Sequence, residues 1–363
     1  SSALQIEYTS ADLSKRAVIH TLGVLSLREF CELQTNQTFQ SYSLEDILKT
    51  IPKLKIANIN FVIFSGGEPL LRKDIFEIAQ CMKDNKIMTY LSTNGTYITQ
   101  KNAQKIIDTF NYIGISIDGI GEVHDYFRGQ KGSYDKSIEA IKTIQKKGGN
   151  AGIRFTITKE TESSFYDIFT LAEELNVNKI YISHLVYSGR GKENLEIDIS
   201  KEKRREYVNF MINKAFEYYE NGKDIDIVTG NMEMDAIMLL KEFEKKYPDF
   251  VNSLKNRLKS WGGNSAGKRL GNMDWNGFVK PDPFFPMTIG NYLEKDFDKI
   301  WLDDNNELLK KLREFPRNIK GKCSSCKYID ICNGGSRSRA YAISGDLWDE
   351  DPSCYLTLEE IKG

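Results

Sequence analysis

Short apolar runs alternate with amphipathic stretches through the first half of the chain. Five of the runs have the length and composition of strands that are buried on both faces of a parallel sheet. They cover residues 59–64, 87–91, 112–117, 153–158 and 180–185. Helical patterns separate the runs, and Ser43 is suited to cap the helix that precedes the first of them. This alternation predicts βαβ units with parallel strands and right-handed crossovers.

The pattern predicts a further strand at each end of this series and a change of texture after it. Leu4 to Tyr8 alternates weakly, as in a first strand, and Ile225 to Val228 has the composition of a last one. We predict a partial (β/α)6 barrel over residues 1–200 and a helical connecting region over 201–260. Residues 261–363, which are rich in glycine, asparagine, proline and cysteine, are predicted to form an irregular C-terminal domain.

Composition narrows the class of protein. The 363 residues carry a formal net charge of −1, which provides no electrostatic basis for binding nucleic acid. No run of 18 apolar residues is present, so we predict no membrane partner. No secretory signal is evident, and we predict a cytoplasmic protein. Only three histidines occur, which argues against a histidine-rich metal site.

Four of the six cysteines fall in one C-terminal window. They are Cys323, Cys326, Cys332 and Cys354. A Cys-x-x-Cys pair lets one loop hold a metal from two sides, so the window suits zinc or an iron–sulfur cluster. A pair of disulfides is the alternative, but the chain shows no sign of an oxidising compartment. We therefore favour a metal.

The turns that follow the predicted strands are candidate ligand sites, because ligands of parallel sheets bind at the carboxyl ends of the strands. The most specific of these turns is Ser65-Gly66-Gly67-Glu68-Pro69. Its glycines allow backbone groups to approach a ligand, and Glu68 is able to accept hydrogen bonds from an amine. The alternative is an ordinary βα turn.

Together these motifs resemble the radical S-adenosylmethionine (SAM) enzymes. The resemblance rests on Gly-Gly-Glu-Pro, Ser-Thr-Asn-Gly at 92–95, Ser-Ile-Asp-Gly at 116–119 and an arginine on the following strand. The C-terminal cysteines resemble the SPASM-type extension that holds an auxiliary cluster. Segments 183–191, 261–267 and 332–340 resemble the subgroup that modifies tetrapyrroles in haem d1 and alternative haem biosynthesis.

The resemblance implies a role for individual residues. Gly66, Gly67 and Glu68 would hold the amino group of SAM, and Ser116 and Asp118 would lie near its ribose and methionine portions. Arg154 would pair with the SAM carboxylate, although an ion pair inside the barrel is an alternative.

The resemblance also implies roles at the C-terminal strand ends and in the cysteine window. The four window cysteines would ligate an auxiliary 4Fe–4S cluster. His184 would contact substrate or transfer a proton, with a packed histidine as the alternative. Arg337 and Arg339 would bind substrate carboxylates, or else be solvated arginines on a loop.

The implied activity is radical SAM modification of a tetrapyrrole, namely removal or alteration of an acetate or propionate side chain of a siroheme derivative. A ferredoxin or flavodoxin would supply electrons. Two other functions stay open. A SPASM-type peptide maturase would use the same scaffold, although we expect no leader-peptide-binding domain before residue 4. A tetrapyrrole-binding carrier would retain the scaffold without catalysis.

One departure from the family pattern concerns the SAM-binding 4Fe–4S cluster. Members hold it with a CxxxCxxC loop after the first strand, and this sequence has no such loop. The best match is Thr9 to Ala17 without its cysteines, and a second placement puts Cys31 last, with Val24 and Arg28 in the other two positions. Three explanations of the missing loop compete. The present sequence lacks residues that the natural protein has, or the chain is an engineered variant without the cluster. The third explanation is a natural degenerate member that binds its ligands but does not catalyse. The intact remainder of the SAM framework favours the first two.

Overall fold

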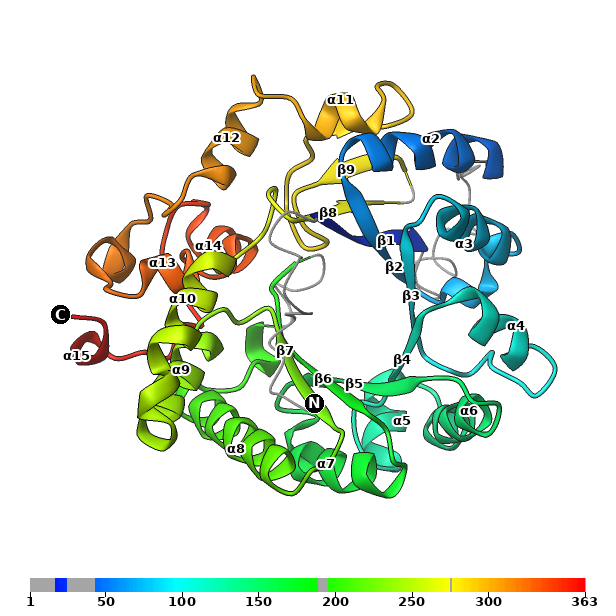
Figure 1. Cartoon of the computed structure of the whole chain (residues 1–363), viewed down its shortest axis with the longest axis horizontal. Helices are drawn as coiled ribbons and strands as arrows, with labels where there is room; N and C mark the ends of the chain where they lie inside the picture. The colour runs from blue at the N-terminus through cyan, green and yellow to red at the C-terminus, as the bar shows by residue number, and fades with distance from the viewer. Residues whose placement is uncertain (1–16, 25–42, 189–194, 275, 363) are drawn as a thin grey trace.

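A curved sheet of ten strands forms the centre of the computed structural model, which describes residues 17–24, 43–188, 195–274 and 276–362 (Figure 1). The strand order is β10-β9-β8-β1-β2-β3-β4-β5-β6-β7. The strands are β1 (Ala17–Val24), β2 (Ile59–Gly66), β3 (Met88–Thr93), β4 (Tyr112–Ser116), β5 (Ala151–Ile157), β6 (Lys179–His184), β7 (Asp226–Gly230), β8 (Leu270–Met273), β9 (Phe278–Lys280) and β10 (Gly290–Asn291).

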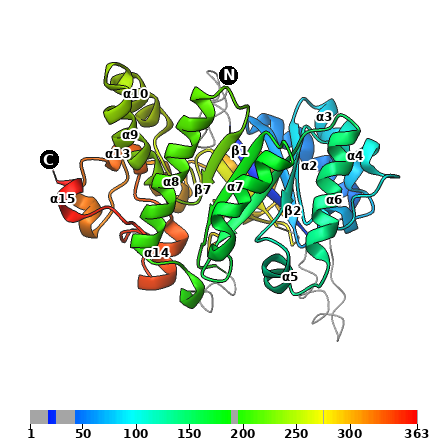
Figure 2. The ribbon, with the colours of Figure 1, turned by 90° about the horizontal axis from the view of Figure 1, so that it is seen from below.

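The described helices are α2 (Leu44–Ile56), α3 (Ile75–Asp84), α4 (Ala103–Thr109), α5 (Glu122–Arg128), α6 (Ser133–Lys146), α7 (Phe165–Glu174), α8 (Lys201–Glu220), α9 (Asp235–Lys246), α10 (Val251–Trp261), α11 (Phe297–Trp301), α12 (Glu307–Arg313), α13 (Ile329–Cys332), α14 (Arg337–Ser344) and α15 (Leu358–Ile361). Helices α2, α3, α4, α6, α7 and α8 lie on the outer face of the curved sheet (Figures 1 and 2). Short 3-10 helices include η2 (Pro69–Leu71) and η6 (Gly321–Ser325).

The predicted partial barrel is confirmed. Strands β1 to β6 are parallel neighbours, and β7 and β8 extend the parallel part at its two edges. The apolar runs form the strands as predicted. Their side chains are buried on both faces of the sheet, toward the barrel interior and against the outer helices. Ser43 caps α2, and its hydroxyl oxygen accepts a hydrogen bond from the Asp46 amide.

The first described strand, β1, pairs with β2. Leu4 to Tyr8, which we predict as a first strand, lies outside the described residues. Most of the best-matching site for the cysteine loop, Thr9 to Arg16, and Cys31 of the second placement also lie outside them. Both placements therefore stay predictions.

The C-terminal region contributes to the same sheet. β8 pairs with β1 in parallel, and β9 and β10 continue from it in antiparallel pairs. The sheet thus crosses the boundary that we predicted near residue 261. Helices α9, α10 and α13 contact one another and place the cysteine segment beside the β7 edge (Figure 1). Among the described helices, none is long and apolar enough to cross a membrane.

Candidate functional site

Glu68 joins the ends of two neighbouring strands. Its side chain is buried, and its carboxylate accepts hydrogen bonds from the Thr93 hydroxyl at 2.7 Å and the Asn94 amide at 2.9 Å, both at the end of β3. The Leu70 amide adds a third at 3.1 Å. Burial raises the pKa of Glu68 above its usual value, and these hydrogen bonds oppose the shift. Glu68 therefore fixes the Gly66-Gly67 turn against the next strand end.

Asp118 has the corresponding position at the end of β4. Its carboxylate accepts a hydrogen bond from the Thr156 amide on β5 at 2.9 Å and pairs with Arg128. Its own amide donates to Nδ1 of His124 at 3.0 Å, so that nitrogen carries no proton. Asp118 is buried and holds β4, β5 and α5 together. These contacts were not visible in the sequence, because their partners lie on two other elements, β5 and α5.

Arg154 lies beside Ser116 in the register of β4 and β5. Its guanidinium carbon is 4.1 Å from the centre of the Tyr181 ring, and the side chain is only partly buried. Gly114 makes room for it, because a Cβ at that position would lie 2.7 Å from Arg154 Cδ. Within the described ranges Arg154 makes no ion pair, so the alternative of a salt bridge inside the barrel is not observed. Its charge is available for a carboxylate.

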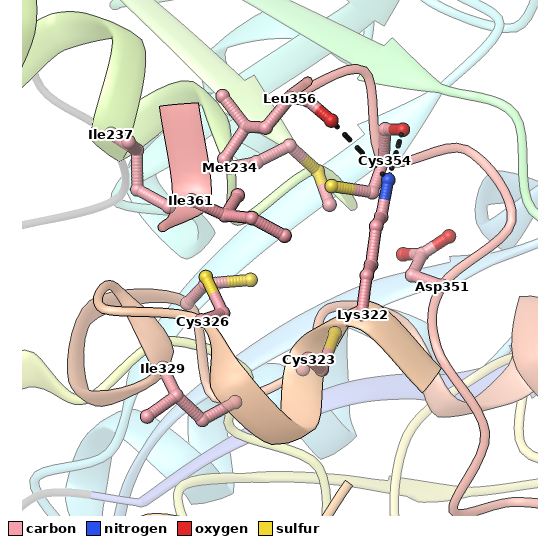
Figure 3. A pocket seen from close by; sticks show the side chains of 12 residues that line it. Met234, Ile237, Lys322, Cys323, Cys326, Ile329, Asp351, Cys354, Leu356 and Ile361 are labelled. Carbon is pink, nitrogen blue, oxygen red and sulfur yellow. Dashed lines mark hydrogen bonds between the residues drawn. The ribbon is translucent and has the colours of Figure 1, made fainter. Parts of the chain in front are cut away.

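The four window cysteines line one pocket, together with Met234, Ile237, Leu356 and other mainly apolar residues. Figure 3 shows the side chains of Cys323, Cys326 and Cys354 around this space. Cys323 belongs to η6 and Cys332 ends α13, whereas Cys354 lies in the segment before α15. The Lys322 side chain donates a hydrogen bond to the Cys354 carbonyl at 3.0 Å. It thus links the segment of Cys323 to the segment of Cys354.

The electrostatics of this pocket favour a bound cation. Burial, together with the neighbouring Cys354 and Cys326, raises the pKa of Cys323 to about 12, although Arg337 opposes the shift. Burial likewise raises the pKa of Cys326, Cys332 and Cys354. Four thiolates at this place require positive charge among them, which iron would supply. None of the five cysteines in the described residues is in a disulfide.

The donor atoms of this pocket are mainly sulfur, and its walls are mainly apolar. Cysteine thiolates are the usual ligands of iron–sulfur clusters and common ligands of zinc. No group of three or more His, Cys, Asp or Glu side chains that would hold a single metal ion is found within the described residues. The residues present fit an iron–sulfur cluster by the chemistry of their donor atoms.

Comparison with known proteins identifies the family. The family model described as the Radical SAM superfamily matches residues 29–172. The chain is 37% identical to "Pre-heme d1 synthase" of Dinoroseobacter shibae, over 87% of this chain and 78% of that protein. It is 36% identical to "Fe-coproporphyrin III synthase" of Methanosarcina barkeri, over 83% of this chain and 76% of that protein. The chain belongs to the radical SAM enzymes of haem biosynthesis.

A solved structure supports the fold of this radical SAM chain. Streptococcus suis SuiB, in a structure bound to S-adenosylmethionine, superposes with a TM-score of 0.70 over 94% of this chain and 78% of that chain. The two sequences are 18% identical, so this likeness concerns the fold alone. The predicted family and fold class are confirmed.

The radical SAM family implies a SAM-binding cluster, but its ligands are missing here. The sequence contains no CxxxCxxC loop, and its six cysteines are Cys31, Cys81 and the four of the window. Cys81 lies in α3 and has no second cysteine beside it among the described residues. The residues present therefore do not fit that cluster.

Arg337 and Arg339 are fully buried. Both side chains are 0% exposed, so they are neither solvated nor open to a large substrate. Arg337 donates to the carbonyls of Leu347 at 2.8 Å and Asp349 at 2.6 Å, and also to Gly334. It closes the loop after α14. The substrate-binding role of Arg337 stays a prediction that this geometry does not favour.

Arg339 forms a buried ion pair. Its guanidinium donates to both carboxylate oxygens of Asp351, at 2.9 and 2.7 Å, and to the Leu185 carbonyl at 3.1 Å. Burial alone would lower the pKa of Arg339, and the adjoining Asp351 outweighs this effect and raises it. Arg339 thus ties the end of β6 to the cysteine segment, and its predicted contact with substrate is likewise not favoured.

His184 is 1% exposed, and both of its ring nitrogens have protein partners. Nε2 is 3.0 Å from Asp235 Oδ2, and Nδ1 is 3.0 Å from an Arg204 nitrogen. A substrate therefore has no free nitrogen to contact. This placement favours the alternative of a packed histidine over the catalytic role, which stays a prediction. Neither Asp235 nor Arg204 was among the residues singled out from the sequence.

Proposed function

We propose that this chain is a tetrapyrrole-modifying member of its family and alters an acetate or propionate side chain of a siroheme derivative. The observation that carries the substrate class is the similarity to pre-heme d1 synthase, which extends over 87% of this chain and 78% of that protein. A small-molecule substrate of this kind also suits the similarity to "Fe-coproporphyrin III synthase" of Methanosarcina barkeri.

In this proposal the barrel provides the SAM site. Gly66 and Gly67 would receive the amino group, and Arg154 would pair with the carboxylate. Glu68 is buried and already accepts three hydrogen bonds, so its contribution is to hold the turn of the two glycines in place. Ser116 lies beside Arg154 in the sheet register, which suits its expected place near the methionine portion. Asp118 already receives hydrogen bonds from two elements, so its contribution is to hold the strand ends in place.

The four window cysteines would hold the auxiliary 4Fe–4S cluster. When bound, such a cluster supplies one-electron chemistry or an iron that positions substrate. Cys323, Cys326, Cys332 and Cys354 would act as thiolate ligands, and the apolar lining would exclude water. A ferredoxin or flavodoxin would be the electron donor. The sequence does not supply the cysteine ligands of the SAM-binding cluster.

Anaerobic reconstitution, followed by assays of SAM cleavage with and without didecarboxysiroheme, tests the proposed function. Cleavage that requires the tetrapyrrole supports it. Cleavage that does not depend on the tetrapyrrole favours the peptide maturase, and tetrapyrrole binding without cleavage favours the carrier. The intact mass should be measured on the same sample. A mass that matches the present sequence, with iron for one cluster only, would exclude the explanation that natural residues are missing from it.

Arg154 provides a direct test of the SAM site. Arg154→Gln removes the charge without a large change in volume, so we expect SAM or S-adenosylhomocysteine to bind about 10- to 100-fold more weakly, as for loss of a charge-assisted hydrogen bond. Isothermal titration calorimetry measures this affinity. Tyr181→Phe is the matched control, because it keeps the ring on which the guanidinium stacks. Unchanged affinity in Arg154→Gln would refute the assignment.

A further inference from the structure

The residues on either side of Cys354 are both tied to the barrel. The Tyr355 hydroxyl donates to Asp235 Oδ1 at 2.7 Å, at the first residue of α9. The Ser353 hydroxyl is 3.0 Å from the Tyr187 hydroxyl, just after β6. Both Ser353 and Tyr355 are buried. The main chain around Cys354 is therefore held from two directions.

The two ties are the ends of one continuous chain of hydrogen bonds. Asp235 contacts His184, which contacts Arg204. Arg204 donates to both oxygens of Asp198 at 2.7 Å, and Asp198 accepts from the Tyr187 hydroxyl at 2.5 Å. Every member of the chain is buried. In order, the side chains are those of Tyr355, Asp235, His184, Arg204, Asp198, Tyr187 and Ser353.

This series of hydrogen-bonded side chains determines where the proton of His184, its middle member, is placed. A guanidinium only donates, so Nδ1 of His184 accepts from Arg204. A neutral imidazole then carries its proton on Nε2 and donates to Asp235. Burial, together with Arg204 and Arg339, lowers the pKa of His184, although Asp235 opposes the shift. The neutral tautomer therefore matches a donor on one side to an acceptor on the other.

The Cys354 segment depends on such contacts because it has little regular structure of its own. Residues 351–357 are described throughout and contain no helix or strand. Within the segment, the Ser353 amide donates to Asp351 Oδ1 and the Cys354 amide to the Asp351 carbonyl, each at 3.0 Å. Side-chain contacts with the barrel thus hold a backbone that secondary structure does not hold.

We propose that His184 is a positioning residue. Through this hydrogen-bonded chain it holds the backbone on both sides of Cys354 and so sets the place of the Cys354 sulfur in the cysteine pocket. The importance of that place for a cluster rests on the proposed function, but the anchoring itself does not. The histidine that the resemblance suggested as catalytic then acts on the auxiliary site through its neighbours, from the end of β6.

Hydrogen exchange of the metal-free full-length chain, followed by mass spectrometry, tests the anchoring. Tyr355→Phe and Ser353→Ala each remove the hydroxyl at one end of the hydrogen-bonded series, with little change in side-chain volume. We expect the Cys354 amide to exchange about tenfold faster in each, which corresponds to about 1.4 kcal/mol and to one buried hydrogen bond. Tyr218→Phe is the matched control. Tyr218 is buried and donates a hydrogen bond to Glu173 at 2.9 Å, and neither residue belongs to the hydrogen-bonded series. Unchanged exchange in both end variants overturns the proposal.

Substitution of His184 separates positioning from simple packing. A glutamine is able to accept from Arg204 and donate to Asp235, so His184→Gln should keep slow exchange at Cys354, whereas His184→Leu should not. If His184→Leu does not fold, the two end variants still decide the question. Equal exchange at Cys354 in folded His184→Gln and His184→Leu would overturn the role of His184.

A second measurement uses the full-length protein reconstituted with iron and sulfide. We expect Tyr355→Phe to alter the EPR spectrum of the reduced cluster and Tyr218→Phe to leave it unchanged. An unaltered spectrum in Tyr355→Phe overturns the link from the hydrogen-bonded chain to the cluster. If the unsubstituted chain takes up no iron, the proposed cluster site fails, and the exchange experiment still decides whether His184 anchors the Cys354 segment.

Discussion

Replacement of Cys326 by alanine is expected to remove all of the iron bound by this chain, from about four atoms to near zero. Cys326 is one of the four cysteines that line the pocket, and the substitution leaves an apolar methyl group where a ligand is needed. Of the three remaining thiols, Cys332 and Cys354 are buried and Cys323 is partly buried. All three have raised pKa values, so without a full set of iron contacts they would remain protonated. Iron and sulfide analysis after anaerobic reconstitution measures the effect.

Cys81→Ala is the control for this experiment. Cys81 lies in α3, far along the chain from the pocket, and its loss should leave the iron content unchanged. Iron that remains after Cys326→Ala would show that the metal is held elsewhere and would contradict the assignment of the pocket.

Replacement of Arg339 by methionine is expected to lower the free energy of unfolding by about 3–5 kcal/mol, because it leaves the buried Asp351 without its counter-charge. Both side chains of this pair are almost fully enclosed, and Asp351 also accepts from the amides of Ser336 and Ser353. Burial by itself would raise the pKa of Asp351. Arg339 and the hydrogen bonds from the amides outweigh burial, and the pKa is lowered. Urea denaturation followed by circular dichroism measures the loss.

Arg205→Met is the control, since Arg205 pairs with Glu360 in a partly exposed position and its loss should cost only about 1 kcal/mol or less. The result also distinguishes two roles for Arg339. If Arg339 binds substrate carboxylates, Arg339→Met would weaken tetrapyrrole binding and leave stability nearly unchanged. If it is a structural pair, stability falls, and Arg339→Met with Asp351→Leu recovers part of the loss.

Much of the barrel was predictable because it repeats a local pattern. The apolar runs became β2 to β6, and the helical region predicted from residue 201 begins with α8. The turn with Glu68 was recognisable for the same reason, since a glycine-rich turn directly after a buried strand lies at the ligand edge of a parallel sheet. Three of the window cysteines lie within ten residues of one another, so their convergence was also a local property.

The roles of several charged residues were not predictable, because their partners are distant in the sequence. Arg339 contacts Leu185, which is 154 positions away, and His184 contacts Asp235, which is 51 positions away. An arginine or histidine in isolation reads as a surface or site residue, and only a partner brought to it by the fold makes its burial favourable.

The sequence by itself determined the family, the parallel strands, the strand-end turn with Glu68 and the cysteines of the pocket, because these depend on short motifs and on the period of hydrophobic residues. It also determined that the SAM-cluster loop is missing. Only the tertiary structure decided that Arg337 and Arg339 are enclosed and that His184 lies within a hydrogen-bonded chain ending on both sides of Cys354. Those assignments depend on which polar groups meet when β6, α8, α9 and the cysteine segment pack together, and no local pattern specifies that meeting.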